Sequence, residues 1–185
     1  AKDMLDFAPD ILLLIHPVGL EDEMLYAIDQ FMMRGGRALI FTDPWHESTD
    51  GRITPRTSRL DRFFETWGVE VVEGRIAGDR TLATRVNAGS GGEVIPAPYI
   101  AWMRASAANF NRDDTITADI QELMLPSMGI IRAKEGSTLA LEPILTTSAE
   151  ATEVETSRLQ DVDVLGLLKD YQPAEKPLTL AARLN

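Results

Sequence analysis

The beginning of the sequence shows two kinds of apolar pattern in succession. Residues 11–15 read ILLLI, a continuous run that is typical of a strand with both faces buried. Over residues 20–32 the apolar side chains recur at helical spacing, and the acidic residues 21–23 favour the start of a helix there. The glycine pair 35–36 ends this helix, and residues 38–42 form a second apolar run. The pattern therefore predicts a strand, a helix and a second strand.

A strand, helix and strand of this length set the direction of both strands. The helix returns the chain across the sheet, so the two strands run parallel, and such a crossover is right-handed in nearly all proteins. We therefore predict a three-layer α/β domain whose mainly parallel sheet is centred on residues 11–15 and 38–42. Both strands then end at the same edge of the sheet.

The remainder of the chain predicts further elements with a looser pattern. An apolar stripe over residues 58–67 predicts a helix in which Trp67 belongs to the buried side, and a valine-rich strand begins at Val69. We also predict strands at residues 99–105, 129–133 and 139–146, a short helix at 117–125 and an acidic surface loop at 148–161. The whole is predicted to be one α/β domain over residues 1–185, with residues 74–112 as an irregular excursion within it.

Net charge limits the classes of partner. The formal charge is -11 and the pI is near 4.6, so a polyanion such as DNA is repelled at long range. The sequence also has no cluster of lysine and arginine for an anionic membrane surface. No apolar run approaches the roughly 20 residues that a membrane-spanning helix needs. We therefore expect no nucleic-acid partner, and membrane attachment only through segments outside these residues.

Polar and aromatic residues follow both predicted strands at their shared edge. His16 comes directly after the first strand, and the second strand is followed by Asp43, Trp45, His46 and Glu47. Open parallel sheets bind their ligands at this edge. Histidine and carboxylate side chains suit Zn²⁺, so a zinc site with both histidines and Asp43 or Glu47 is one interpretation. The spacing contains no metal motif, so we expect a ligand or partner edge, here called the crest, without a metal.

Three further features are candidate catalytic or ligand positions. The chain has no cysteine and no G-x-S-x-G motif, and Ser127 precedes a strand rather than following one, so we expect a turn residue there and no nucleophile. The GSGG stretch at 89–92 lacks the lysine of a phosphate-binding loop and is interpreted as a hairpin tip. Thr146 and Thr147 can donate hydrogen bonds to a small ligand at a strand end, and we include both with the crest.

Paired carboxylates occur at Asp113 with Asp114 and at Glu153 with Glu155. A general acid needs burial or a close like charge to raise its pKa. The polar sequence around both pairs indicates solvated, ionised side chains. We therefore predict no catalytic residue among them.

Five segments of the chain resemble, in order, those of a known family. They are residues 20–44, LEDEMLYAIDQFMMRGGRALIFTDP; 58–71, SRLDRFFETWGVEV; 114–132, DTITADIQELMLPSMGIIR; 141–151, LEPILTTSAEA; and 177–185, PLTLAARLN. The family is the auxiliary extracytoplasmic component of ABC-type transport systems, which is associated with gliding-motility transporters. The resemblance implies a flavodoxin-like or class I amidotransferase-like fold on the periplasmic side of the cytoplasmic membrane. It also implies a larger, membrane-anchored parent protein, of which this chain is a soluble fragment.

The resemblance leads to a function of the transport class. The implied partners are an ABC transporter permease and an ATP-binding subunit, and the family has no catalytic motif or cofactor to carry over. We expect a non-catalytic interaction or ligand-sensing domain, with Trp45 and Trp102 as exposed anchors of a partner surface. Two alternatives stay open. One is a small-molecule hydrolase or metal-dependent enzyme with its site at the crest, and the other is a solute-binding domain for a carbohydrate or peptide.

Overall fold

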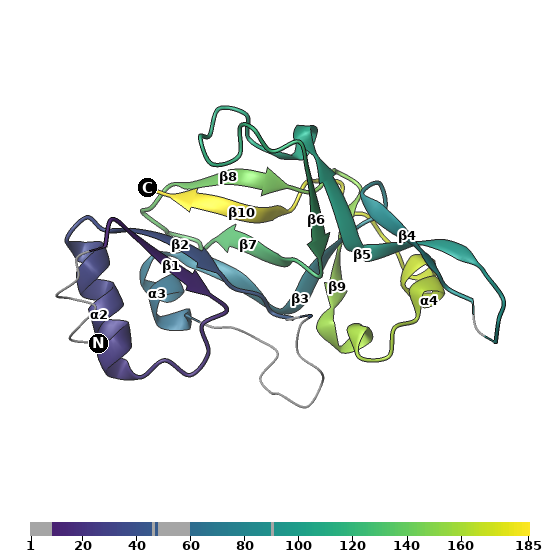
Figure 1. Ribbon diagram of the computed structural model, residues 1–185, viewed down its shortest axis with the longest axis horizontal. Helices are drawn as coiled ribbons and strands as arrows, with labels where there is room; N and C mark the ends of the chain where they lie inside the picture. Colours follow the sequence, from purple (N-terminus) through teal and green to yellow (C-terminus); the bar gives the residue numbers. More distant parts are fainter. Residues whose placement is uncertain (1–8, 46, 48–59, 90) are drawn as a thin grey trace.

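Two regions of different architecture make up the structure (Figure 1). The computed structural model describes residues 9–45, 47, 60–89 and 91–185. A parallel pair of strands and two helices form one end of the molecule, drawn in purple and blue. Antiparallel sheets form the rest, and their strands continue to the yellow C-terminal segment.

The first two strands form the parallel pair that the sequence predicts. Strand β1 (Ile11–Ile15) is followed by helix α2 (Asp22–Met33) and strand β2 (Arg37–Phe41). The pairing is in register from Ile11 opposite Arg37 to Ile15 opposite Phe41. Gly35 ends the helix in a left-handed conformation with φ 86, and its N–H donates to the Met32 carbonyl at 2.9 Å. The parallel direction of β1 and β2 is therefore confirmed.

Both helices of this region cover the same face of the strand pair. Helix α3 (Asp61–Thr66) is the next element after β2, and its Phe63 ring stacks on that of Trp67 with the ring centroids 5.3 Å apart. One apolar cluster contains residues of β1, β2, α2 and α3, namely Leu12, Leu14, Ile40, Ile28, Phe63 and Phe64. Because successive strand residues point to opposite faces, these contacts leave the other face of β1 and β2 uncovered by either helix.

The uncovered face is apolar and exposed. It consists of every second residue of the two strands: Ile11, Leu13 and Ile15 of β1, and Arg37, Leu39 and Phe41 of β2. The five apolar members keep 60%, 54%, 61%, 40% and 48% of their surface in contact with solvent. We call these six residues the free face.

The prediction of a mainly parallel, flavodoxin-like sheet is wrong for the rest of the chain. Outside β1 and β2, every strand pairing in the described residues is antiparallel. One sheet has the order β7 (Gly129–Ala133), β3 (Val69–Asp79), β9 (Ala151–Glu155); a second has β4 (Ala83–Asn87), β5 (Pro96–Ser106), β6 (Glu122–Pro126); a third pairs β8 (Leu141–Thr146) with β10 (Thr179–Leu184). The structure is not a three-layer parallel fold. We call β3 to β10 the antiparallel body.

A short connection explains the antiparallel pairing of β4 with β5. A parallel connection needs a crossover of a dozen or more residues, usually a helix. Only residues 88–95 separate β4 from β5, which pair with each other, so no crossover fits between them. The shorter links at 80–82, 127–128 and 147–150 join strands of different sheets.

The prediction of a short helix at residues 117–125 is also wrong, because residues 117–119 form turns and a strand follows them. Residues Glu122–Pro126 form β6, which pairs antiparallel with β5 from Trp102 opposite Pro126 to Ser106 opposite Glu122. Glutamate, leucine and methionine are good helix formers, but pairing with β5 and burial of Leu125 override this local preference. The remaining short elements are η1 (Ala107–Asn109), η2 (Thr156–Leu159) and α4 (Val164–Lys169).

Two apolar clusters form the core of the antiparallel body. One gathers residues from β3, β5, β6, β7, β8 and β10, with Met103 and Ala105 fully buried at its centre. The other joins Ile76 and Ile100 to Leu167 of α4 and to Trp45, which comes from the loop after β2. In the part of the chain that the structure describes, no helix is both long and apolar enough to span a bilayer.

Candidate functional site

The crest brings His16 and Asp43 together, as the parallel strands predict. The Nδ1 atom of His16 lies 3.9 Å from an Asp43 carboxylate oxygen, which is within ion-pair range but beyond a hydrogen bond. His16 has a left-handed backbone with φ 44, and its N–H donates to the Phe41 carbonyl at 2.9 Å. This turn holds the imidazole over the end of β2. His46 lies outside the described residues.

Trp45 belongs to the core and is not an exposed anchor. Only 7% of Trp45 is accessible, and the ring packs in the cluster that contains Ile76 and Tyr99 of the antiparallel body. Its neighbour Pro44 is buried too, and its ring lies where a side chain at Gly129 would be, 2.6 Å from the position of a Cβ atom. The crest therefore joins the β1–β2 pair to the antiparallel body.

Glu47 completes this joint through two hydrogen bonds to the body. Its Oε1 atom accepts from the Ser127 hydroxyl and from the indole N–H of Trp102, the latter at 3.2 Å. The Trp102 ring in turn lies 5.4 Å from that of Tyr99. Burial, together with the negative charge of Glu47, raises the pKa of Tyr99 to about 12. The carboxylate of Glu47 is thus bonded to the body, although the residue itself is exposed.

Ser127 is a turn residue, as the sequence predicts. It connects β6 to β7 with a left-handed φ of 49, and its N–H donates to the Ala101 carbonyl at 2.8 Å. The residue is fully buried, and its hydroxyl points to Glu47. A nucleophile must be reached by its substrate, so the Ser127 hydroxyl is not placed for attack in this structure.

Thr146 and Thr147 end a strand of another sheet and do not lie on the edge that β1 and β2 share. Thr147 is 3% exposed. Its hydroxyl accepts from the Leu178 N–H at 2.7 Å and donates to the Ser148 carbonyl at 3.0 Å. These bonds connect β8 to the segment before β10 and leave the hydroxyl buried inside the protein.

The metal interpretation receives no support from the described side chains. Among residues 9–45, 47, 60–89 and 91–185, no three histidine, aspartate or glutamate side chains are grouped closely enough to hold a metal ion. His16 and Asp43 could supply two ligands, while a structural zinc site uses four. Any contribution of His46 lies outside the described residues.

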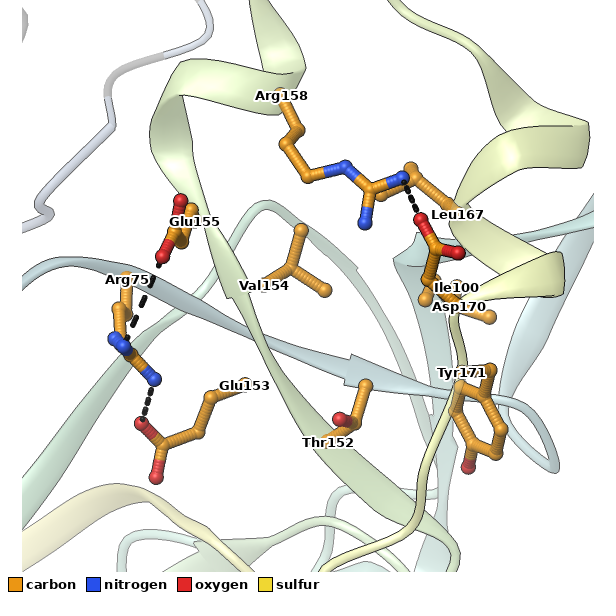
Figure 2. Close-up of a pocket in the computed structure, with 10 residues that line it drawn as sticks. All are labelled: Arg75, Ile100, Thr152, Glu153, Val154, Glu155, Arg158, Leu167, Asp170 and Tyr171. Atoms are coloured by element: carbon orange, nitrogen blue, oxygen red, sulfur yellow. Dashed lines mark hydrogen bonds and ion pairs between the residues drawn. The ribbon is translucent and has the colours of Figure 1, made fainter.

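A pocket of about 310 Å³ lies in the antiparallel body between β9 and α4 (Figure 2). Its residues come from β3, β5, β9, η2 and α4 and from the segment after α4: Arg75, Ile100, Thr152, Glu153, Val154, Glu155, Arg158, Leu167, Asp170 and Tyr171. Ile100, Val154 and Leu167 supply apolar surface, and the other side chains are polar or charged. This size is at the lower limit for small-molecule sites.

The charged side chains of the pocket are paired with one another. Arg75 lies 3.3 Å from a Glu153 oxygen and 3.8 Å from a Glu155 oxygen, on one side of the pocket. Arg158 lies 3.0 Å from Asp170 on the other side. A polar ligand would have to compete with these pairs. Eight of the ten lining residues come from residues 152–171, while Arg75 and Ile100 are added by β3 and β5.

Asp114 departs from the prediction that the paired carboxylates are solvated. The residue is 8% exposed, and its carboxylate accepts from Arg183 Nε at 2.8 Å and Nη2 at 2.9 Å. The Arg183 guanidinium and the Ile116 N–H lower the pKa of the Asp114 carboxyl. A lowered pKa is the opposite of what a general acid needs, so this pair is structural and connects the segment after η1 to β10.

Comparison with known proteins bears on the chain as a whole. Residues 4–185 match the sequence model of an auxiliary family described as "ABC-type uncharacterized transport system". No curated protein and no solved structure matches the chain. The family match includes both the crest and the pocket, and it confirms the resemblance seen in residues 20–44 and in the later segments.

Proposed function

Because the chain belongs to this family of ABC-type transport systems, as an auxiliary component, we propose that it is a non-catalytic interaction domain. In this role it lies on the extracytoplasmic side of the membrane and binds the permease and ATP-binding subunits of its system. The proposal is supported by a family match over nearly the whole chain and by the internal contacts that the crest side chains make.

The observation that carries the non-catalytic part is the use of crest side chains in internal contacts. Glu47 accepts two hydrogen bonds from the antiparallel body, Trp45 is buried in its core, and the Ser127 hydroxyl is inaccessible. A catalytic edge leaves such groups open to a substrate. Here the polar groups hold two regions of one protein together, and the free face supplies exposed apolar surface instead.

Co-purification tests the interaction role. The tagged full-length protein is extracted from its native membrane in mild detergent and isolated through the tag. We expect the permease and the ATP-binding subunit in a fixed ratio to the tagged protein, since a component of the system binds its partners stably enough to be isolated. An unrelated membrane protein with the same tag is the control. A tagged protein that is isolated alone, although both subunits are present in the membrane, contradicts the proposal.

Solute binding is the second candidate, favoured by the pocket between β9 and α4. A ligand that binds only the folded protein raises its melting temperature by mass action. A screen of carbohydrates and short peptides should then contain a compound that stabilises the wild type and not Arg75→Gln. The control is Arg104→Gln, which removes an exposed ion pair with Glu122 on another sheet. Equal stabilisation of both variants would place binding elsewhere.

A further inference from the structure

The free face is unusual because parallel strands are normally covered on both sides. All-parallel sheets occur almost only where helices pack on both faces, and their strands are apolar throughout. The sequence ILLLI of β1 has this composition, yet α2 and α3 share one face and Ile11, Leu13 and Ile15 remain more than half exposed. The five apolar side chains together leave on the order of 500 Å² in one patch, near the upper limit for monomeric proteins.

The dimensions of the free face fit a single α-helix. Two strands about 4.8 Å apart present a strip about 10 Å wide, and five residues at about 3.3 Å each give a length of about 16 Å. A helix with its side chains is about 10–12 Å in diameter, and three turns of it span about 16 Å. A second copy of this chain is less suitable, because each copy carries a net charge of -11 and two such chains repel one another.

Arg37 places a positive charge at one end of the free face. It occupies the free face at the start of β2, opposite Ile11, and it forms no ion pair with another described residue. A helix that packs antiparallel to the strands, as crossover helices do, brings its C-terminal end to the starts of β1 and β2. A cation is favourable beside a helix C-terminus, and an acidic side chain in the last turn can pair with it.

We propose that the free face docks an amphipathic α-helix of about three turns from another subunit of the transport system. The helix has an apolar stripe that covers Leu13 and Leu39, and an acidic residue in its last turn that pairs with Arg37. The proposal rests on the proposed function and specifies its partner surface.

A synthetic helix tests the chemistry of the face. The probe is a hydrocarbon-stapled amphipathic peptide of about 14 residues, with a leucine stripe and two glutamates in its last turn, titrated calorimetrically into the purified chain. We expect saturable binding that falls at least tenfold for Leu13→Gln/Leu39→Gln. The control variant is Val94→Gln, which changes a side chain that is 71% exposed on the β4–β5 connection. No binding to the wild type, or equal loss in both variants, overturns the proposal.

Charge exchange tests the direction of the helix. Replacing Arg37 with Glu should weaken the glutamate peptide, and a peptide with lysines in place of the two glutamates should recover its affinity only with that variant. A peptide with the glutamates moved to the first turn should bind the wild type at least threefold more weakly. If the peptides with glutamates in the first turn and in the last turn bind the wild type with equal affinity, the antiparallel arrangement is overturned.

Photocrosslinking in the membrane identifies the source of the helix. A photoreactive phenylalanine replaces Leu13 in the full-length protein, or Val94 as the matched control, and the adducts are sequenced by mass spectrometry. We expect an adduct with an apolar-striped peptide of another subunit at position 13 and none at position 94. An adduct with a second copy, with lipid or with the same chain, or no adduct in an isolated intact complex, overturns the proposal. If no complex is isolated at all, the proposed function itself fails.

Discussion

The β1–β2 pair and the antiparallel body are two regions of one protein that differ in how far they bury their apolar strand residues. In the body, Ile76 of β3 is fully buried and Ile100 of β5 is 1% exposed. In the parallel pair, Ile11 and Ile15 are 60% and 61% exposed, although all four residues are isoleucines within strands. The body buries its apolar side chains within the chain itself. The parallel pair does so on one face only, so its stability within this chain depends on α2, α3 and the crest joint.

The two regions also differ in how polar groups are satisfied. The carboxylate of Asp79, which is fully buried in the body, accepts from the N–H groups of Thr81, Leu82 and Ser148 at 2.7 to 3.0 Å. The polar groups of the crest instead cross between the regions, from Glu47 to Ser127 and Trp102. Internal contacts therefore stabilise the body, while cross-contacts orient the parallel pair. Substitutions in the two regions should differ accordingly.

The largest expected effect comes from a core substitution in the body. Ile76→Ala removes most of a side chain with no exposed surface from a packed cluster. The lost burial and the cavity should lower the free energy of unfolding by about 3–4 kcal/mol, as is usual for buried isoleucine truncated to alanine. Urea unfolding monitored by tryptophan fluorescence measures it. A change below about 1 kcal/mol would mean that this cluster is not a packed core.

Asp79→Ala should have the next largest effect. The change leaves three backbone N–H groups without their acceptor at the junction of β3 with two turns. Unsatisfied buried donors are costly, so we expect a loss of about 2–3 kcal/mol in the free energy of unfolding. Asp79→Asn keeps one acceptor oxygen and should lose less. Equal losses of stability for Asp79→Ala and Asp79→Asn would mean that the oxygen retained in asparagine accepts no stabilising hydrogen bond.

The sequence predicts the parallel region well and the body poorly, for a physical reason. Strands 11–15 and 38–42 are joined by a helix whose apolar spacing and glycine stop are local signals. The strands of the body pair across long separations, such as Arg75 with Glu155, which no local pattern records. Residues 88–95 between β4 and β5 are nevertheless too few for a parallel crossover, and this local signal already indicates that these two strands pair antiparallel.

The crest also combines features that local sequence predicts with features that depend on long-range packing. That His16 and Asp43 share an edge follows from the direction of β1 and β2, and their 3.9 Å separation agrees with it. That Glu47 bonds to Ser127, eighty residues away, depends on how the two regions dock, and the sequence contains no sign of this. The burial of Trp45 has the same origin. Local patterns thus identify an edge, while tertiary packing decides whether it stays open.

Tyr99 makes the joint sensitive to high pH. Its pKa of about 12 in the folded chain lies above the value of about 10 expected in the unfolded chain. The folded state therefore binds this proton more tightly, and the corresponding stability is complete below pH 10 and is lost between about pH 10 and 12. Burial also raises the pKa of Tyr171, so absorbance at 295 nm during alkaline titration should show late tyrosine ionisation, of which the part near pH 12 is lost in Tyr99→Phe. Glu47→Gln should lower the pKa of Tyr99 by only part of the difference between the folded and unfolded chains, because burial is the larger cause of the raised pKa.

Asp114 makes the stability of the body depend on pH in the acid range. Its folded pKa is lowered by Arg183, so the stability from this pair is complete above the unfolded value of about 4 and is lost as pH falls through the folded pKa. Asp114→Asn should therefore destabilise the chain at neutral pH and make the melting temperature less dependent on pH below 4. The control is Asp113→Asn, which changes the exposed neighbouring carboxylate. Parallel pH profiles for wild type and Asp114→Asn would contradict the role of the ion pair.

The smallest change in the free energy of unfolding is expected on the free face, where Ile11 can be compared directly with Ile76. Ile11→Ala makes the same chemical change as Ile76→Ala, but at a side chain that is 60% exposed rather than fully buried. Little burial is lost and no cavity forms, so the free energy of unfolding of the chain should change by at most about 0.5 kcal/mol. Urea unfolding of both variants under the same conditions measures the difference. A loss at Ile11 close to that at Ile76 would mean that the free face is covered in solution, and in that case its stability would depend on protein concentration if a second copy were the cover.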